Sequence, residues 1–225
     1  MIRVMIVDDE ILLRTCMQRI LECEPDIEVP VVCDGRDVLE AVDTHRPDVV
    51  LLDLRMPDVD GLTALERIRS RPAPPAVAIL TTFLTDEDIA AALRSGAAGF
   101  LMKDATPQEL AHVVRVLAAG GTVLSAAAAR IVVDGYLDTG LRHGERDPRL
   151  DTLTEREHEV LELLAEGLTN ADIGRRLLLS ASTTKEHVST ILTKLGLTNR
   201  VQAAVVAHRA AAARRRPPAA LAEAR

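Results

Sequence analysis

Five short apolar runs, each followed by a stretch in which apolar residues recur every three or four positions, constrain the first half of this 225-residue chain. The runs occupy residues 4–7, 27–32, 49–52, 77–80 and 98–102. Strands that alternate with helices in this way form a parallel sheet with helices on both faces. The pattern therefore predicts an α/β domain built from five β-α units in a doubly wound arrangement.

The C-terminal part of the chain carries helical patterns without a strand signal. Residues 154–157 read TERE, which fits the capping box that begins many helices, and Gly167 ends the helix that follows. Two further short helices are expected between residues 170 and 196, the second of them beginning after Ser180 or Ser182. Two short helices joined by a tight turn, the later one rich in polar side chains, favour a helix-turn-helix.

These two patterns divide the chain into four parts. We expect a first domain over residues 1–120, a linker with a short helix over 121–150, a helical domain over 151–210 and a flexible tail over 211–225. The linker ends in a stretch rich in glycine and charged residues, which is typical of a connection between domains. The tail combines arginines with two prolines and is expected to fray.

The net charge of −7 is unevenly distributed along the chain. Residues 1–119 hold 12 basic and 21 acidic side chains, whereas residues 151–225 hold 11 basic and 9 acidic ones. An acidic first domain is repelled by DNA and by anionic membranes, so any contact with nucleic acid belongs to the C-terminal domain. The three aromatic residues, Phe83, Phe100 and Tyr136, are too few for the base stacking used by proteins that bind single-stranded nucleic acid.

Several other classes of protein are excluded by the pattern of apolar and metal-binding residues. No uncharged apolar run reaches the roughly 18 residues that a membrane-spanning helix needs. Asp8 and Asp9 interrupt the first apolar run too early for a signal peptide, so we expect a cytosolic protein without a membrane partner. The cysteines lack CxxC spacing and the histidines lack ligand spacing, so neither a disulfide framework nor a zinc site is expected.

Polar residues follow the predicted strands at the points where the strands end. Asp8 and Asp9 end the first strand, Asp53 ends the third, Thr81 the fourth and Lys103 the fifth. Ligands of parallel sheets bind at this edge, and three carboxylates gathered there repel one another unless a cation such as Mg²⁺ joins them. A divalent cation, a lysine, a hydroxyl and a nucleophilic carboxylate together suit phosphoryl transfer.

Each of these residues also has a simpler interpretation. Asp8 and Asp9 could cap the following helix, which is a common use of aspartate. Lys103 could be a solvated surface lysine, and Thr81 could be an ordinary strand residue. The joint presence of Asp53 and Lys103 with the aspartate pair favours the site over these alternatives.

Four motifs in the first domain carry a family resemblance. They are DDE at residues 8–10, DLRMPDVDG at 53–61, LTT ending at Thr82 and GFLMKD at 99–104. In this order they resemble the receiver domain of bacterial two-component response regulators, over residues 1 to 120. The resemblance implies a flavodoxin-like (βα)5 fold with a five-stranded parallel sheet.

The resemblance also implies roles for individual residues of the acidic edge. Asp53 would be the phosphoacceptor, phosphorylated by a sensor histidine kinase. Asp8, Asp9, Asp53 and the backbone carbonyl of Arg55 would hold Mg²⁺ as the cofactor. Pro57 and Gly61 would shape the loop after the acceptor.

Three further residues would respond to the phosphoryl group. Lys103 would pair with it and Thr81 would donate a hydrogen bond to it. Phe100 would be the switch aromatic on the fifth strand, although an ordinary place in the core is an equally good interpretation of this residue.

The last of the predicted short helices has one apolar and one polar face. Thr184, Val188, Ile191, Leu192 and Leu195 share the face expected to pack on the core, and a solvated amphipathic helix would show the same pattern. The sequence on both sides of this helix favours a role in DNA binding over a merely solvated face.

The sequence from residue 153 to 177, LTEREHEVLELLAEGLTNADIGRRL, and that from 182 to 209 closely resemble the LuxR-type DNA-binding domain. Two positions depart from the family pattern, where Val and Ala are favoured: Thr184 and Gly174. A glycine inside a helix costs about 1 kcal/mol of helix propensity relative to alanine.

By this resemblance the polar face of the helix enters the major groove of double-stranded promoter DNA. Lys185, Glu186 and Ser189 would lie nearest the bases. Further DNA contacts, mostly to phosphates, would come from Ser182, Thr183, His187 and Lys194.

Together the two halves resemble a response regulator of the NarL/FixJ type, which implies a transcription regulator and not an enzyme. Activation would produce a homodimer through the last helix, with Val201, Ala204 and Val205 at the contact. Two alternatives stay open: a receiver controlled by partners or ligands instead of phosphate, and a phosphotransferase or phosphatase. The intact acidic site argues against the first, and the sequence shows no second catalytic cluster for the other.

Overall fold

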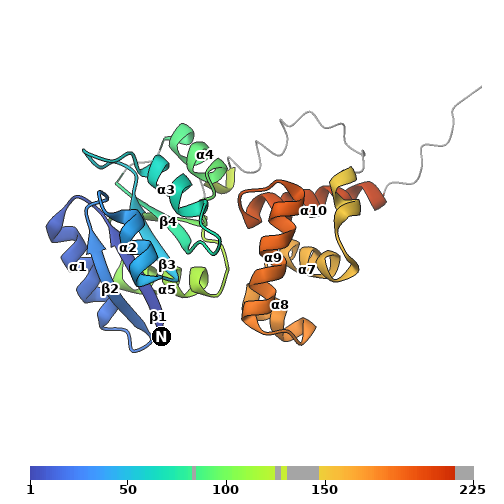
Figure 1. The fold of residues 1–225 in the computed structure, drawn as a ribbon, viewed down its shortest axis with the longest axis horizontal. Coiled ribbons are helices and arrows are strands. Elements are labelled where there is room, and N and C mark those ends of the chain that lie inside the picture. Colours follow the sequence, from blue (N-terminus) through green and yellow to red (C-terminus); the bar gives the residue numbers. More distant parts are fainter. Residues whose placement is uncertain (83–84, 125–127, 131–146, 216–225) are drawn as a thin grey trace, which may run out of the picture. The chain divides into compact units, whose positions relative to one another are not determined.

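The structure is a computed structural model that describes residues 1–82, 85–124, 128–130 and 147–215. The chain forms two compact units, Met1–Val133 and Asp134–Arg225 (Figure 1), and we describe each by itself. The domain limits expected at residues 120, 150 and 210 stay predictions. Most of the helix expected in the linker lies outside the described residues.

The first unit contains a parallel five-stranded sheet in the order β2-β1-β3-β4-β5. The strands are β1 (Ile2–Val7), β2 (Ile27–Cys33), β3 (Val49–Asp53), β4 (Ala76–Thr81) and β5 (Gly99–Met102). The helices between and after them are α1 (Ile11–Glu22), α2 (Val38–His45), α3 (Gly61–Arg69), α4 (Asp86–Arg94) and α5 (Pro107–Ala118). This confirms the doubly wound, flavodoxin-like fold that the five β-α units predict.

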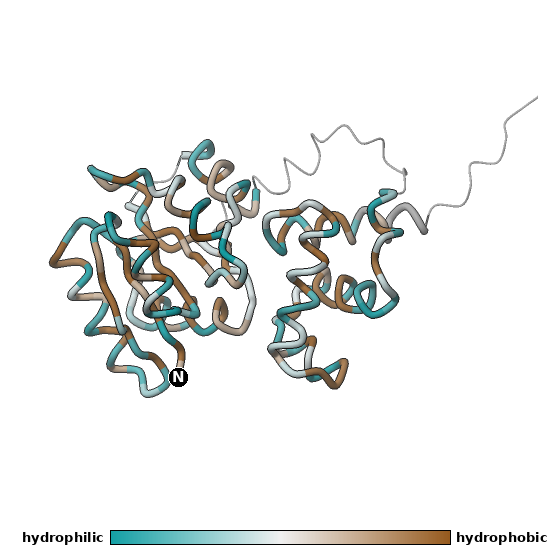
Figure 2. The backbone as a smooth tube through the Cα atoms, viewed as in Figure 1, coloured by the Kyte–Doolittle hydropathy of each residue, from teal (hydrophilic) through white to brown (hydrophobic). Residues whose placement is uncertain are grey.

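Two apolar clusters cover the two faces of this sheet. One joins the strands to α2, α3 and α4, and the other joins them to α1 and α5. Every residue of the central strand β3 is buried, and its side chains alternate between the clusters, as Leu51 and Leu52 show. The strands accordingly form the brown interior of this unit in Figure 2. A continuous apolar run is what a parallel strand between two helix layers requires.

Gly61 lets helix α3 begin directly against the end of β3. The carboxylate of Asp60 caps the helix by accepting hydrogen bonds from the N–H groups of Leu62 and Thr63. A Cβ atom on Gly61 would clash with the carbonyl oxygen of Asp53 and would lie 2.6 Å from the Cα atom of Leu54. Both neighbours are backbone atoms, so a side chain here has to displace the strand end that carries Asp53.

We therefore expect Gly61→Ala to lower the free energy of unfolding of the first unit by about 2 kcal/mol, the usual cost of overpacking. Urea unfolding followed by the NMR amide signals of β3 measures it. Wild-type stability in this variant would show that the close contact at Gly61 relaxes without cost.

The chain after α5 continues along the outer edge of β5. The N–H of Phe100 donates to the carbonyl of Val123 (3.0 Å), and the N–H of Val123 donates to the carbonyl of Ala98 (3.2 Å). Val123 also forms a parallel bridge with Gly99. Ala128 is fully buried against the α2, α3 and α4 cluster. The start of the expected linker thus packs as part of the first unit.

The second unit is helical, as the sequence predicts. Its elements are η1 (Pro148–Thr152), α7 (Glu155–Ala165), α8 (Asn170–Leu177), α9 (Ala181–Leu195) and α10 (Arg200–Arg215). Threonines at positions 154 and 169 form complete capping boxes at the starts of α7 and α8, and Ser180 caps α9. The core combines apolar residues of all four α-helices, among them Leu164, Ile173 and Ile191.

The two departures from the LuxR-type pattern lie against each other in this unit. A Cβ atom on Gly174 would be 2.8 Å from the carbonyl oxygen of Leu179 and 3.1 Å from Oγ1 of Thr184. Thr184 is fully buried, and its hydroxyl donates to the carbonyl of Ser180 (3.0 Å). The glycine in α8 thus permits the close approach of the turn and of α9. This packing explains why a residue of low helix propensity stands inside the helix.

Candidate functional site

The carboxyl ends of the strands gather the predicted acidic residues. Asp8 follows β1, Asp53 ends β3 and Thr81 ends β4, and all three are buried. Carboxylate oxygens of Asp8, Asp9 and Asp53 lie within 4.8 Å of one another, and Asp9 is the most exposed of the three. Neighbouring parallel strands end at the same edge, which is why residues so distant in sequence meet here.

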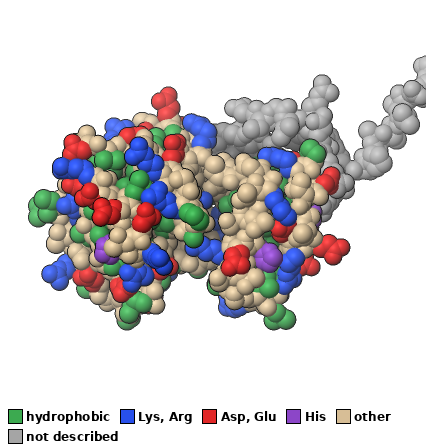
Figure 3. Space-filling view, viewed as in Figure 1, with side chains coloured by type: hydrophobic (Ala, Val, Ile, Leu, Met, Phe, Trp, Pro, Cys, Tyr) green, Lys and Arg blue, Asp and Glu red, His purple; other side chains and the backbone are tan. Residues whose placement is uncertain are grey.

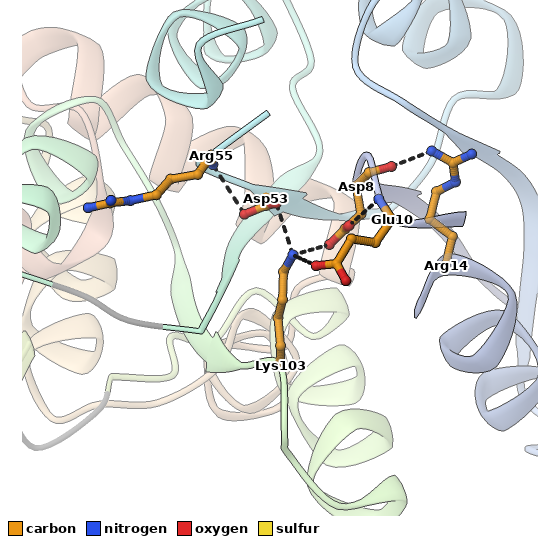
Figure 4. Close-up of polar contacts among 6 residues, drawn as sticks. All are labelled: Asp8, Glu10, Arg14, Asp53, Arg55 and Lys103. Carbon is orange, nitrogen blue, oxygen red and sulfur yellow. Dashed lines mark hydrogen bonds and ion pairs between the residues drawn. The ribbon is translucent and has the colours of Figure 1, made fainter. Parts of the chain in front are cut away.

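Lys103 reaches into the centre of this acidic group (Figure 4). Its Nζ lies 2.8 Å from Oδ2 of Asp8 and donates to Oδ2 of Asp53 (3.0 Å) and to Oε1 of Glu10 (3.1 Å). Its side chain is 11% exposed, which argues against a solvated surface lysine. Burial favours the neutral amine, but the hydrogen bonds with the carboxylates outweigh it and raise the pKa of Lys103 above its ordinary value.

The donor set fits a hard divalent cation. Three carboxylates converge, and Oδ2 of Asp8 is buried without a hydrogen bond of normal geometry, its contact with Lys103 being an ion pair. Burial raises the pKa of Asp8 because the charged form loses solvation. A cation at this position would stabilise the charged form, and oxygen ligands of this kind suit Mg²⁺.

Arg55 contributes its backbone to the site while its side chain points away from it. The N–H of Arg55 donates to Oδ1 of Asp53 (3.2 Å). Its guanidinium group contacts Asp88 at the start of α4 (3.1 Å), and Figure 4 shows the side chain directed away from Asp53. The backbone of Arg55 thus contacts Asp53 through its N–H, and the role of its carbonyl as a metal ligand stays a prediction.

Two residues beside the pocket were not singled out from the sequence. Glu10 contacts Lys103, and the guanidinium group of Arg14 donates to the backbone carbonyl of Asp8 (Figure 4). The spacing of four residues between Glu10 and Arg14 places both on one side of the start of α1, which is the signal that could have indicated them.

Thr81 and Phe100 occupy different surroundings. The carbonyl of Thr81 accepts the N–H of Lys103 (2.9 Å), so the threonine borders the acidic pocket. Phe100 is 4% exposed and packs in the cluster with Ile89 and Leu93 of α4. Its packing matches the ordinary core interpretation, and its role as a switch stays a prediction.

Helix α9 has the two faces that the sequence predicts. Thr184, Val188, Ile191 and Leu195 are buried, and Leu192 packs partly against the same core. The candidate DNA-contacting residues Ser182, Lys185, Glu186 and Ser189 are exposed, whereas Thr183 and His187 are half-buried. The hydroxyls of Thr190 and Thr193 donate to carbonyls of their own helix. The exposed strip is therefore available to a partner.

Lys194 contacts a buried carboxylate inside the unit, and its expected contact with DNA phosphates stays a prediction. Its Nζ donates to both carboxylate oxygens of Glu157 in α7, at 2.7 and 2.9 Å. The side chain of Glu157 is only 7% exposed, and that of Lys194 is 32% exposed. A helical wheel gives the direction in which Lys194 leaves the axis of α9. Its long side chain then bends back to the buried carboxylate of Glu157.

Most other cations of helices α7 to α9 also contact carboxylates, in pairs that lie at the surface. Arg156 contacts Glu159, Arg175 contacts Asp172 and Arg176 contacts Glu166; with Lys194 these are the paired cations of α7 to α9. Within these three helices Lys185 is the one lysine or arginine for which the described residues include no carboxylate contact. The face shown in Figure 3 likewise mixes side chains of both charges.

Helix α10 combines an inner and an outer side. Ala203 and Ala207 are buried in the core of the unit, and Ala204 packs partly against it. Val201 and Val205 are half-buried and are not part of that core. Of the three residues expected at a dimer contact, the two valines are thus the ones left for a partner.

None of the helices in the described part of the chain has the length and apolar character to span a bilayer.

Comparisons with known proteins agree with both halves of the structure. Residues 4–115 match the model of the response regulator receiver domain, and residues 151–207 match that of the luxR family of bacterial regulatory proteins. The transcriptional regulatory protein LiaR of Bacillus subtilis is 37% identical over 93% of this chain and 98% of its own length. The nitrate/nitrite response regulator protein NarL of Escherichia coli K12 is 36% identical over 92% of this chain and 94% of its own.

A solved structure extends the comparison to the fold. The crystal structure of the response regulator ChrA of a heme-sensing two-component system is 32% identical and covers 94% of this chain and 98% of its own, with a TM-score of 0.50. Because the relatives match over nearly their whole length, both units are shared. The chain belongs to the NarL-type response regulators, in which a receiver domain precedes a LuxR-type DNA-binding domain.

Proposed function

We propose that Asp53 accepts a phosphoryl group from the phosphohistidine of a sensor histidine kinase. The observation that carries the proposal is the contact of one buried lysine, Lys103, with the carboxylates of Asp8, Asp53 and Glu10. A carboxylate oxygen of Asp53 forms the new bond to phosphorus, the bond to the histidine nitrogen breaks, and that nitrogen keeps the electron pair. Mg²⁺, held by Asp8, Asp9, Asp53 and the carbonyl of Arg55, would neutralise charge on the phosphoryl oxygens.

The surrounding groups divide the remaining work. The N–H of Arg55 occupies Oδ1 of Asp53, whereas Oδ2 faces Lys103. Once Asp53 is phosphorylated, the ammonium group of Lys103 pairs with the negatively charged phosphoryl group. Its raised pKa keeps the lysine positively charged for this role. Thr81 donates a hydrogen bond to a phosphoryl oxygen. Positioning and charge neutralisation of this kind supply most of the catalysis in phosphoryl transfer.

The output proposed is binding of the phosphorylated homodimer to promoter DNA. The strip formed by Ser182, Lys185, Glu186 and Ser189 enters the major groove, and Thr183 and His187 lie beside the backbone. In helices α7 to α9 four of the five cations contact carboxylates. These helices therefore offer little free positive charge to DNA phosphates, so one copy binds weakly and two are needed. Val201 and Val205 of α10 supply the contact between copies.

The experiment treats the full chain with acetyl phosphate in the presence and absence of Mg²⁺. Peptide mass spectrometry should locate phosphate on the peptide that contains Asp53, only with Mg²⁺. Selection of bound sequences from random duplex DNA should then recover a two-fold symmetric site more efficiently with the phosphorylated protein. A receiver controlled without phosphate would give the same DNA binding in both states. A phosphotransferase would pass the phosphate to added acceptors.

We expect Glu186→Ala to relax discrimination at one base pair of the site by about 1 to 3 kcal/mol. The exposed carboxylate can accept a hydrogen bond from the amino group of cytosine, which alanine cannot. Thr190→Ala is the matched control on the same helix, because the Thr190 hydroxyl is bound to the carbonyl of Glu186. Binding-site selection with both variants measures the effect, and an unchanged preference in Glu186→Ala would refute this orientation of α9.

A further inference from the structure

Arg14 holds the loop that carries two of the expected metal ligands from outside the pocket. Its guanidinium group donates to the backbone carbonyl of Asp8, on the side of that residue opposite Lys103 (Figure 4). The side chain of Asp8 is fixed independently, since its Oδ1 accepts the N–H of Glu10 (2.9 Å). The N–H of Asp8 donates to the carbonyl of Cys33 (3.1 Å). Arg14 is thus the side chain that restrains the remaining backbone group of Asp8.

The first turn of α1 has few other restraints. The N-cap residue Glu10 makes no capping hydrogen bond with its side chain, and the first turn contains no acidic residue. An arginine so near the N-terminus of a helix opposes the positive end of the helix dipole, which is unfavourable by itself. The helix therefore lacks the usual restraints at this end, and the Arg14 contact ties it to the loop of Asp8 and Asp9.

We propose that Arg14 is a positioning residue for Mg²⁺, acting through Asp8 and Asp9. The inference rests on the proposed function, since it concerns the same metal site. Groups that orient metal ligands from behind typically change metal affinity by about 10- to 100-fold when they are removed. Arg14 does this through the backbone: it fixes the direction of the peptide between Asp8 and Asp9 without contacting either carboxylate.

The test compares Arg14→Met with Arg19→Met in the full chain by titration of the NMR amide signals with Mg²⁺. Arg19 is an exposed residue of the same helix, so its replacement removes the same charge without touching the loop. Loss of a positive charge beside a cation site should by itself tighten Mg²⁺ binding. We expect instead about 10-fold weaker binding in Arg14→Met and binding within about twofold of the wild type in Arg19→Met.

A second measurement separates positioning from damage to the pocket. With acetyl phosphate, Arg14→Met should need about 10-fold more Mg²⁺ for half-maximal labelling but reach the wild-type rate at saturation. Mg²⁺ affinity equal to or tighter than that of the wild type, or a lowered rate at saturation, overturns the inference. If Arg14→Met does not fold, Arg14→Lys and Arg14→Gln replace it; the lysine keeps the positive charge and most of the aliphatic side chain. Wild-type Mg²⁺ affinity in both of these variants would then overturn the inference. Failure of the wild-type chain to bind Mg²⁺ would instead remove the proposed function itself.

Discussion

Replacing Asp53 by asparagine will abolish labelling by acetyl phosphate. The amide cannot supply the carboxylate oxygen that attacks phosphorus. Asp53 is the buried carboxylate at the end of β3, and its Oδ2 accepts a hydrogen bond from Lys103. The neutral side chain also removes one of the three charges that hold Lys103. We expect no phosphorylated species above the level of the protein incubated without acetyl phosphate, measured by intact-protein mass spectrometry.

Asp58→Asn provides the control for this variant. Asp58 lies in the loop after the acceptor, is 62% exposed and contacts Arg36 instead of Lys103. It should be labelled like the wild type. Wild-type labelling of Asp53→Asn would show that another residue accepts the phosphate, and equal loss in both variants would point to damage of the loop.

The second large effect concerns Lys194. We expect Lys194→Met to lower the free energy of opening of the second unit by about 3 kcal/mol, because the variant leaves the buried carboxylate of Glu157 without its partner. Fully buried pairs cost up to about 5 kcal/mol when broken, and partial exposure of the Lys194 side chain argues for the lower limit. Hydrogen exchange of the amides in α7 to α9 measures this unit separately from the receiver.

The same pair makes the second unit sensitive to acid. Burial by itself would raise the pKa of Glu157, but hydrogen bonds from Lys194 and from the N–H of Thr154 outweigh it and hold the pKa below its ordinary value. A depressed carboxyl pKa stabilises the folded state above the unfolded value, about 4.3, and that contribution is lost as the pH falls through the folded value. In Lys194→Met, stability should therefore depend less on pH over this acidic range.

Lys185→Met is the matched comparison for Lys194→Met, since both remove a lysine from α9. The exposed Lys185 variant should keep the wild-type exchange rates while its DNA affinity falls and its preference at one base pair of the site relaxes. The opposite result, in which Lys194→Met exchanges like the wild type but loses a unit of salt dependence, would return Lys194 to the phosphate contacts.

The sequence predicts the architecture well because each element leaves a local signal. Apolar runs such as that of β3 and the capping boxes at Thr154 and Thr169 are readable within a few residues of the chain. The acidic pocket is also predictable, because parallel strands must end at one edge and polar residues end them here. The two departures at Gly174 and Thr184 were visible too, although only the structure shows that they touch.

Long side chains mark the limit of such reasoning. The direction of Lys194 depends on a buried carboxylate 37 positions earlier in the chain, and no local pattern in α9 indicates it. No sequence pattern indicates the contact of Arg14 with a backbone carbonyl either, because every residue type has that acceptor. Half-buried apolar residues of α10 illustrate a third limit: a helical wheel does not distinguish a contact within the unit from one with a second copy.

Each edge of the five-stranded sheet has a feature that disfavours pairing with a further strand. Along β5, Val123 occupies the backbone groups that another strand would use. Along β2, Pro30 lacks an N–H, and the pairing with β1 shifts register between Arg3 and Met5. Exposed edges of this kind are the usual starting points for aggregation and for β-mediated assembly. Pairing of two receivers edge to edge is therefore disfavoured, and the exposed sides of the described helices are the surfaces that remain for a contact between two first units.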